Sequence, residues 1–147
     1  MIFNELQLLA YIALAMLLAG VIGLERELAD KPAGLRTHML VAGAATCFTG
    51  LSEILIMNLG AYSSLISSDP VRIIEATITG ISFLGAGTII RNREESGVEG
   101  LTTAASLLFV GAIGIGVAQR HFVLAIGATL LVFLTLRVVK YVEKRLT

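Results

Sequence analysis

The sequence is poor in the residues on which most soluble protein functions depend. Its single cysteine, Cys47, excludes an intramolecular disulfide and a CxxC zinc pair. Charged residues make up only 15% of the 147 residues, and eleven Lys and Arg balance eleven Asp and Glu. This neutral balance argues against nucleic-acid binding, which needs a strongly basic face. Walker A, HExxH and GxSxG motifs are absent, so we expect no enzymatic activity.

What the sequence has in excess is apolar residues. Hydrophobic residues make up 56% of the chain, and the mean hydropathy is +0.86. A helix that crosses a membrane needs about 20 mostly apolar residues. Five such runs lie at about residues 6–24, 39–59, 71–90, 101–118 and 122–139. We therefore predict an all-α membrane protein with five transmembrane helices, which form a single domain over residues 1–147.

The basic residues predict how these five spans are oriented. Lys and Arg near the ends of spans favour the cytoplasmic side. Nine of the eleven lie in residues 25–38, in the segment after the third run, or at the C-terminal end. Only Arg72 and Arg120 lie in the other connections. We therefore predict that the N-terminus is outside and the C-terminus is cytoplasmic, which agrees with an odd number of spans.

Charged residues within the apolar runs need an explanation, because each costs about 2.5–3.5 kcal/mol at the centre of a bilayer. Glu53 lies in the outer part of the second run, and Arg72 and Glu75 lie near the start of the third. An ion pair between Glu53 and Arg72 would lower the cost. The alternatives are a proton- or cation-binding carboxylate with Glu75 as a second acid, or a Glu53 that faces water at the interface.

Polar residues are densest in the segments predicted to meet at the cytoplasmic face. We expect one polar cluster there, although ordinary span flanks and helix caps would give a similar composition. Its candidate members are Glu25, Arg26, Glu27, Arg36, Thr37, His38, Arg91, Thr102 and Thr103. A single histidine where a helix begins is more typical of hydrogen bonding than of metal binding. The residues alone leave a metal site open.

Small residues recur at a spacing of four, as at Ala15 and Ala19, and this pattern predicts close helix packing. In the third run, Gly80 is followed by Gly85 and Gly87. The last two lie on different faces of a helix, so a single packing interface does not explain both. The alternative is a broken helix whose backbone groups bind an ion, as in many transporters.

Several motifs together resemble the MgtC/SapB family of bacterial membrane proteins. They are GLERE at 23–27, AGLRTHMLV at 33–41, Asp69-Pro70 followed by Arg72, GISFLGAGTIIR at 80–91 and GLTTAASL at 100–107. The combined match, over roughly residues 20–118, is highly specific. The resemblance implies that the functional positions are the polar residues Glu25, Arg26, Arg36, Thr37, Arg91, Thr102 and Thr103 and the backbone positions Gly80, Gly85 and Gly87.

The resemblance also implies a function. It indicates a protein of the bacterial inner membrane that is linked to growth under low magnesium. Such a protein would act as a non-enzymatic regulator of other membrane proteins, including the membrane sector of the F-type ATP synthase. The alternative is a small transporter or channel for Mg²⁺ or another cation, working as an oligomer such as a homodimer. We expect no cofactor, with Mg²⁺ as a ligand or substrate at most. We also expect the short, SapB-like form without the family's cytoplasmic C-terminal domain.

Overall fold

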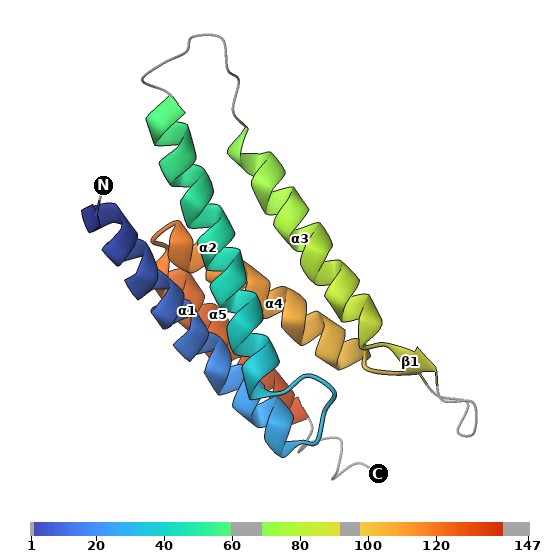
Figure 1. Ribbon diagram of the computed structural model, residues 1–147. Helices are drawn as coiled ribbons and strands as arrows, with labels where there is room; N and C mark the ends of the chain where they lie inside the picture. The colour runs from blue at the N-terminus through green and yellow to red at the C-terminus, as the bar shows by residue number, and fades with distance from the viewer. Residues whose placement is uncertain (1, 60–68, 92–97, 140–147) are drawn as a thin grey trace.

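The computed structural model describes residues 2–59, 69–91 and 98–139, and this part of the chain is almost entirely helical (Figure 1). A short antiparallel pair of strands, in which Ile90 faces Glu99, joins the third helix to the fourth. The elements in chain order are α1 (Ile2–Leu28), α2 (Leu35–Leu59), α3 (Pro70–Gly87), β1 (Ile90–Arg91), β2 (Val98–Glu99), α4 (Leu101–Ala118), α5 (Phe122–Leu134) and a π-helical turn, η1 (Thr135–Val139).

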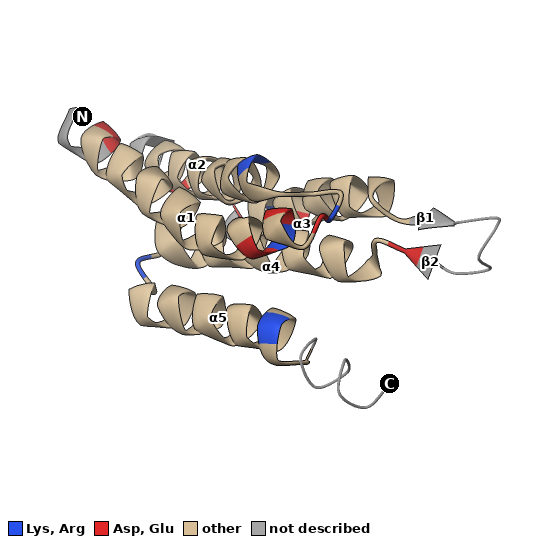
Figure 2. Cartoon of the chain, turned by 90° about the horizontal axis from the view of Figure 1, so that it is seen from below, with Lys and Arg blue, Asp and Glu red and all other residues tan. Residues whose placement is uncertain are grey.

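Consecutive helices run in alternating directions along the bundle (Figure 1). The α1–α2 connection, the strand pair and η1 therefore lie at one end, which we call the hairpin end. The end of α2, the start of α3 and the α4–α5 turn lie at the other, the turn end. This arrangement places Arg26, Lys31, Arg36, Arg91 and Arg137 toward one end, as predicted. The other basic residues of these segments, Arg93, Lys140, Lys144 and Arg145, lie outside the described residues. Figure 2 shows the charged residues near the ends of the helices. Which end faces the cytoplasm stays a prediction.

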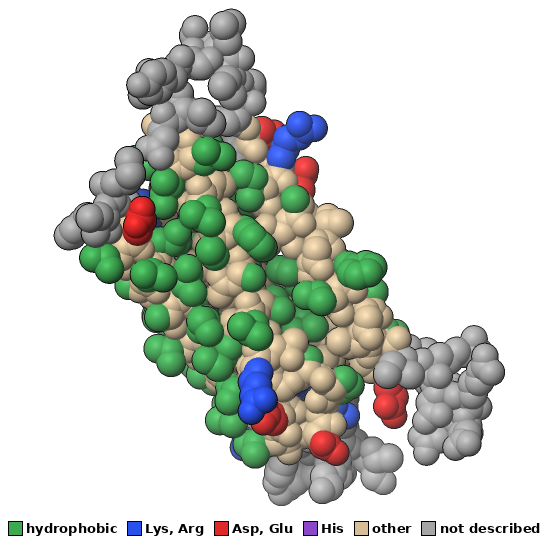
Figure 3. All heavy atoms as spheres, in the orientation of Figure 1, with side chains coloured by type: hydrophobic (Ala, Val, Ile, Leu, Met, Phe, Trp, Pro, Cys, Tyr) green, Lys and Arg blue, Asp and Glu red, His purple; other side chains and the backbone are tan. Residues whose placement is uncertain are grey.

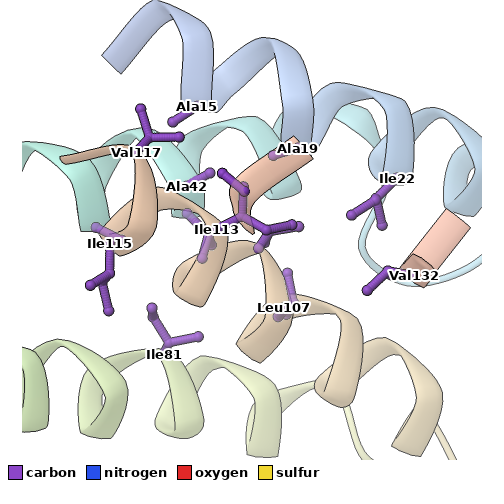
Figure 4. Packing of buried hydrophobic residues seen from close by; sticks show 14 of the residues in the cluster. Ala15, Ala19, Ile22, Ala42, Ile81, Leu107, Ile113, Ile115, Val117 and Val132 are labelled. Carbon is purple, nitrogen blue, oxygen red and sulfur yellow. The ribbon is translucent and has the colours of Figure 1, made fainter. Parts of the chain in front are cut away.

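α4 is the central helix, and it contacts α1, α2, α3 and α5. Figure 4 shows Ala19 of α1, Ala42 of α2, Ile81 of α3 and Val132 of α5 around it, with Ile113 of α4 among them. Small residues make this packing possible, because they let helix backbones approach closely. A Cβ atom at Gly114 would collide with the carbonyl oxygen of Ala42. The predicted role of small residues in packing is therefore confirmed for this part of the bundle.

The outer surface of the bundle is apolar. Figure 3 shows hydrophobic side chains spread over the helices on the face in view. Large apolar residues are widely exposed, with Phe83 80% and Val123 88% accessible. In water such a surface would be unfavourable, but lipid tails are as apolar as these side chains. The surface therefore fits a membrane environment.

Four helical segments are long and apolar enough to cross a membrane: 5–28, 35–57, 101–118 and 122–139. The predicted run at 71–90 is not among them. It forms a helix, α3, but this helix ends at Gly87 and carries Arg72 and Glu75 among its 18 residues. In the described part of the chain, the prediction of an all-α protein with five helices is thus confirmed apart from the short strand pair, whereas the number of spans remains open at α3.

Candidate functional site

The candidate functional site is a set of buried polar residues at the hairpin end, where α1, α2 and α4 meet. We call Glu25, Arg26, His38, Thr103 and Ser106 the buried polar set. None of these residues is more than 6% exposed. Buried polar groups need partners, because an unpaired one costs about 1–3 kcal/mol. Their partners show how the site is built.

Glu25 and Arg26 form a buried ion pair. The Arg26 Nη2 atom lies 2.6 Å from Glu25 Oε2, and each side chain is 5% exposed. The Arg26 Nε–H also donates to the same oxygen at 2.6 Å. Neighbouring residues of a helix normally diverge around its axis. Here burial turns both side chains towards each other, so the end of α1 brings no net charge into the bundle.

His38 joins α2 to α4 through both ring nitrogens. Nδ1 lies 2.9 Å from the Gly34 carbonyl oxygen, and Nε2 lies 2.9 Å from Ser106 Oγ. A carbonyl only accepts, so Nδ1 must carry a proton. In a neutral ring Nε2 then accepts from the Ser106 hydroxyl. That hydroxyl also lies 2.8 Å from the Thr103 carbonyl oxygen, so the serine has two acceptors for one proton.

The motif residues around this set join α1 closely to α2. A Cβ atom at Gly23 would lie 2.8 Å from Leu35 Cα and 2.9 Å from His38 Cβ, so only glycine fits there. Glu27 Oε2 accepts from the backbone N–H of Leu35 at 2.7 Å. Leu35 is the first residue of α2, and a carboxylate there satisfies a free N–H and complements the positive end of the helix. The GLERE and AGLRTH motifs thus form a structural joint.

The structure does not gather all nine predicted residues. Arg36, Thr37 and Thr102 are exposed, and the side chain of Arg91 lies outside the described residues. Residues 36, 37 and 38 follow each other at about 100° around a helix, so burying His38 turns the other two away. Arg36, Thr37 and Thr102 therefore do not belong to the buried polar set, and a functional role for them at this end stays a prediction. Flank residues at one end of a bundle need not face the same interior.

The glycines of α3 behave differently from one another. A Cβ atom at Gly85 would lie 3.3 Å from Ala104 Cβ, whereas one at Gly80 or Gly87 would meet nothing within 4 Å. The helix continues through Gly85, and the Gly85 carbonyl accepts from the Thr88 N–H at 2.9 Å and from the Thr88 hydroxyl at 2.7 Å. α3 therefore runs unbroken to Gly87 and ends there in a cap at Thr88, three residues before the end of the predicted run. Ion binding by the backbone groups at this end stays a prediction.

At the turn end, Glu53 has a different partner from the predicted one. It accepts from Arg120 Nη2 at 3.0 Å, and both side chains are about half exposed. The predicted pair with Arg72 is not formed. The reason is that α4 packs along α2 and so carries the α4–α5 turn to Glu53. Arg120 has a φ of 65°, a left-handed conformation that favours glycine. Glu75 is exposed on α3.

Two residues with polar contacts between helices, Ser106 and Arg120, were missed by the sequence reasoning. Ser106 stands one turn after Thr103, and this i, i+3 spacing on a helix of small residues was a usable signal. Arg120 had no such signal, because its partner is 67 residues away in sequence. No three His, Cys, Asp or Glu side chains come together as a metal site within the described part of the chain.

Comparisons with known proteins fit this structure. The sequence profile of the MgtC family matches residues 12–145. Protein MgtC of Brucella abortus is 42% identical over 108 residues, which cover 72% of this chain and 40% of the relative. The Escherichia coli K12 protein named "Putative magnesium transporter YhiD" is 34% identical over 90% of this chain and 60% of its own length. Protein SapB of Bacillus subtilis is 29% identical, over 95% of this chain and 59% of its own length.

This chain therefore spans about 40–60% of the length of these relatives. No solved structure matches it significantly.

Proposed function

Because the chain belongs to the MgtC family, we propose that it is a bacterial inner-membrane regulator in magnesium homeostasis. On this proposal it carries no enzymatic activity and acts by binding other membrane proteins. The printed name of the E. coli relative supplies the link to magnesium. The choice of a regulator rests on the geometry of the bundle.

The observation that carries this choice is the filled interior. Eleven of the 18 residues of α4 are buried, and none of the 18 is charged. The buried charges that are described, Glu25 and Arg26, neutralise each other. An ion path needs polar groups that can replace water around the ion along the whole route. A core made mostly of small and branched apolar residues, in which polar groups such as His38 and Thr46 are hydrogen-bonded within the bundle, supports docking through helix surfaces better than conduction.

The partner proposed for this regulator is another membrane protein, with the membrane sector of the F-type ATP synthase as the first candidate. A second copy of this chain is the other candidate. In either case the contact would be made by helices within the bilayer, where small residues and shape matter more than hydrophobicity.

A cation transporter is the second candidate function, and two observations favour it. One is the name of the E. coli relative. The other is the turn end, where Glu53 and Arg120 border a cavity of about 340 Å³ that Thr49, Ser52 and Gln119 also line. Mg²⁺ usually keeps several waters and binds through one or two carboxylates. Glu53 would be such a ligand after release from Arg120.

Reconstitution of the pure protein separates the two functions. Proteoliposomes that contain a magnesium-sensitive dye are compared for the wild type, Glu53→Gln and the matched control Glu75→Gln. The regulator proposal predicts no flux above empty liposomes for all three, together with recovery of a membrane partner by cross-linking in cells. Flux by the wild type that Glu53→Gln abolishes and Glu75→Gln retains would instead establish the transporter.

A further inference from the structure

An apolar groove runs between α2 and α3, and the proposed function makes no use of it. The groove has a volume of about 660 Å³. Its walls include Phe48 and Leu55 of α2 and Ile73 and Leu84 of α3. The groove exists because α3 packs mainly against α4 and makes fewer contacts with α2. Small residues in both walls deepen the groove, namely Ala44, Ala45, Ala76 and Gly80.

One charged residue lines the groove, and it lies at one end. Arg72 is in the first turn of α3, at the turn end of the bundle. Among the described residues it forms no salt bridge, and residues 60–68 contain no Asp or Glu. Asp69 and Glu75 are the nearest acids in sequence, each three residues away; Asp69 is bound to the backbone N–H of Val71 at 3.0 Å, and Glu75 forms no salt bridge with Arg72. The groove thus combines an apolar trough with a free positive charge at its end.

The length and the charge of the groove indicate which occupant fits. The α2 wall extends from Val41 to Leu55, which is roughly 21 Å along a helix. The outer surface of the bundle is apolar and fits a membrane, so lipid surrounds the groove. An apolar trough with one cation at its end matches a hydrocarbon chain that carries an anionic headgroup.

We propose that the α2–α3 groove is a binding site for an anionic phospholipid, with its headgroup on Arg72 and one acyl chain between the two helices. Arginine binds phosphate through paired N–H donors. A length of roughly 20 Å exceeds one leaflet of the hydrocarbon core, about 15 Å, so the chain follows the trough from the headgroup level inward. The site is independent of the proposed function and of the direction in which the protein is inserted.

The absence of tryptophan in the chain allows a clean test. Phe48→Trp places one fluorophore in the groove, and Phe83→Trp places one on the exposed side of α3, outside the groove lining. The full chain is reconstituted into phosphatidylcholine bilayers that contain brominated phosphatidylglycerol or brominated phosphatidylcholine. Bromine quenches tryptophan only at close range, so the ratio of the two quenching constants reports the preference of each position.

We expect Phe48→Trp to show an about fivefold preference for the anionic lipid, the effect of one basic residue at a membrane surface. Phe83→Trp should show none. Adding Arg72→Ala should abolish the preference. Arg120→Gly, which removes an arginine at the same end but outside the groove, should retain it. An excess of inorganic phosphate should leave the preference unchanged, because the acyl chain contributes to binding.

A second pair of variants tests the trough itself. Gly80 lines the groove and Gly87 does not, and a Cβ atom at either position meets nothing within 4 Å. Gly80→Leu should reduce quenching of the groove fluorophore by both lipids, whereas Gly87→Leu should not. Equal quenching of Phe48→Trp by the two lipids would overturn the proposal. So would protection of Phe48→Trp from both lipids together with cross-linking to a second copy, which would assign the groove to a helix.

Discussion

α3 and α4 have the same length of 18 residues and pack against each other, yet they have opposite environments. Eleven residues of α4 are buried. Among the described side-chain positions of α3, only Ile81 and Gly85 are buried. α4 carries no charge, whereas α3 carries Arg72 and Glu75 near its start. The two helices therefore divide the bundle into a closely packed part around α4 and a loosely held part at α3.

The glycines show what this difference means. Gly114 of α4 lies against the Ala42 carbonyl of α2, whereas Gly80 and Gly87 of α3 have open space around them. The same residue type serves as a packing contact in one helix and leaves a surface open in the other. A glycine pattern on a membrane helix therefore identifies packing only when a neighbour lies over it.

Substitutions of Arg26 and Arg72 are expected to differ most in their effect on the free energy of unfolding. Arg26→Met leaves Glu25 as an unpaired buried charge, and this should lower the free energy of unfolding by about 3–5 kcal/mol. Arg72→Met, at an exposed position of α3, should change it by less than about 0.5 kcal/mol. Denaturant titration of the reconstituted protein, followed by circular dichroism, measures both. Recovery of most of the loss in the double variant Glu25→Gln/Arg26→Met would identify the unpaired charge as the cause.

Replacing glycines with alanine should show the next largest contrast. Gly114→Ala forces the backbones of α4 and α2 apart and should destabilise the protein by about 2–3 kcal/mol. Gly87→Ala adds a methyl group in open space and removes a flexible residue, so it should be neutral or stabilising by up to about 1 kcal/mol. The same titration applies. Equal losses at both positions would contradict the division between α3 and α4.

A smaller effect is expected at the hydrogen bond between α2 and α4. Ser106→Ala leaves His38 Nε2 without its partner and should cost about 1–3 kcal/mol. Ser82→Ala, at an exposed position of α3, is the matched control and should fall within about 0.5 kcal/mol of the wild type. Nitrogen NMR of the labelled histidine gives an independent readout, because loss of the serine should shift the Nε2 resonance. An unchanged resonance would show that the two side chains do not interact.

The smallest effect is expected at the turn end. Arg120→Gly removes a half-exposed ion pair worth about 0–1 kcal/mol, but it also relieves the left-handed backbone at this position. The two contributions oppose each other, so the free energy of unfolding should change by less than about 1 kcal/mol. Arg120→Ala keeps the backbone strain and should be less stable than Arg120→Gly. The reverse order would show that strain at this turn is negligible.

Much of the fold was predictable from the sequence because hydrophobic runs of membrane length leave few alternatives. All five predicted runs contain a helix, and the fourth, 101–118, has the predicted boundaries. The predicted ends were less accurate where polar residues continue a helix, as in α1, which extends to Leu28. Apolarity marks the part of a helix in the membrane, whereas backbone hydrogen bonding sets where the helix ends.

Predicting the candidate site was harder, because it depends on which side of each helix is buried. The sequence indicated that Glu25, Arg26, His38 and Thr103 lie at one end of the bundle, and they do. It did not distinguish these buried residues from Arg36, Thr37 and Thr102, which lie at the same end but are exposed. Neighbours in sequence point in different directions on a helix. Whether each side chain is buried therefore depends on which side of the helix contacts another helix.

The sequence by itself determined an apolar helical bundle with its basic segments gathered at one end, because composition and the spacing of charges act through local rules. Only the tertiary structure decided that Glu53 pairs with Arg120, that Ser106 binds His38, and that Arg72 stands free beside a groove. These contacts join residues far apart in the chain. They depend on how closely α4 can approach its neighbours, and that approach is set by side-chain volume in three dimensions.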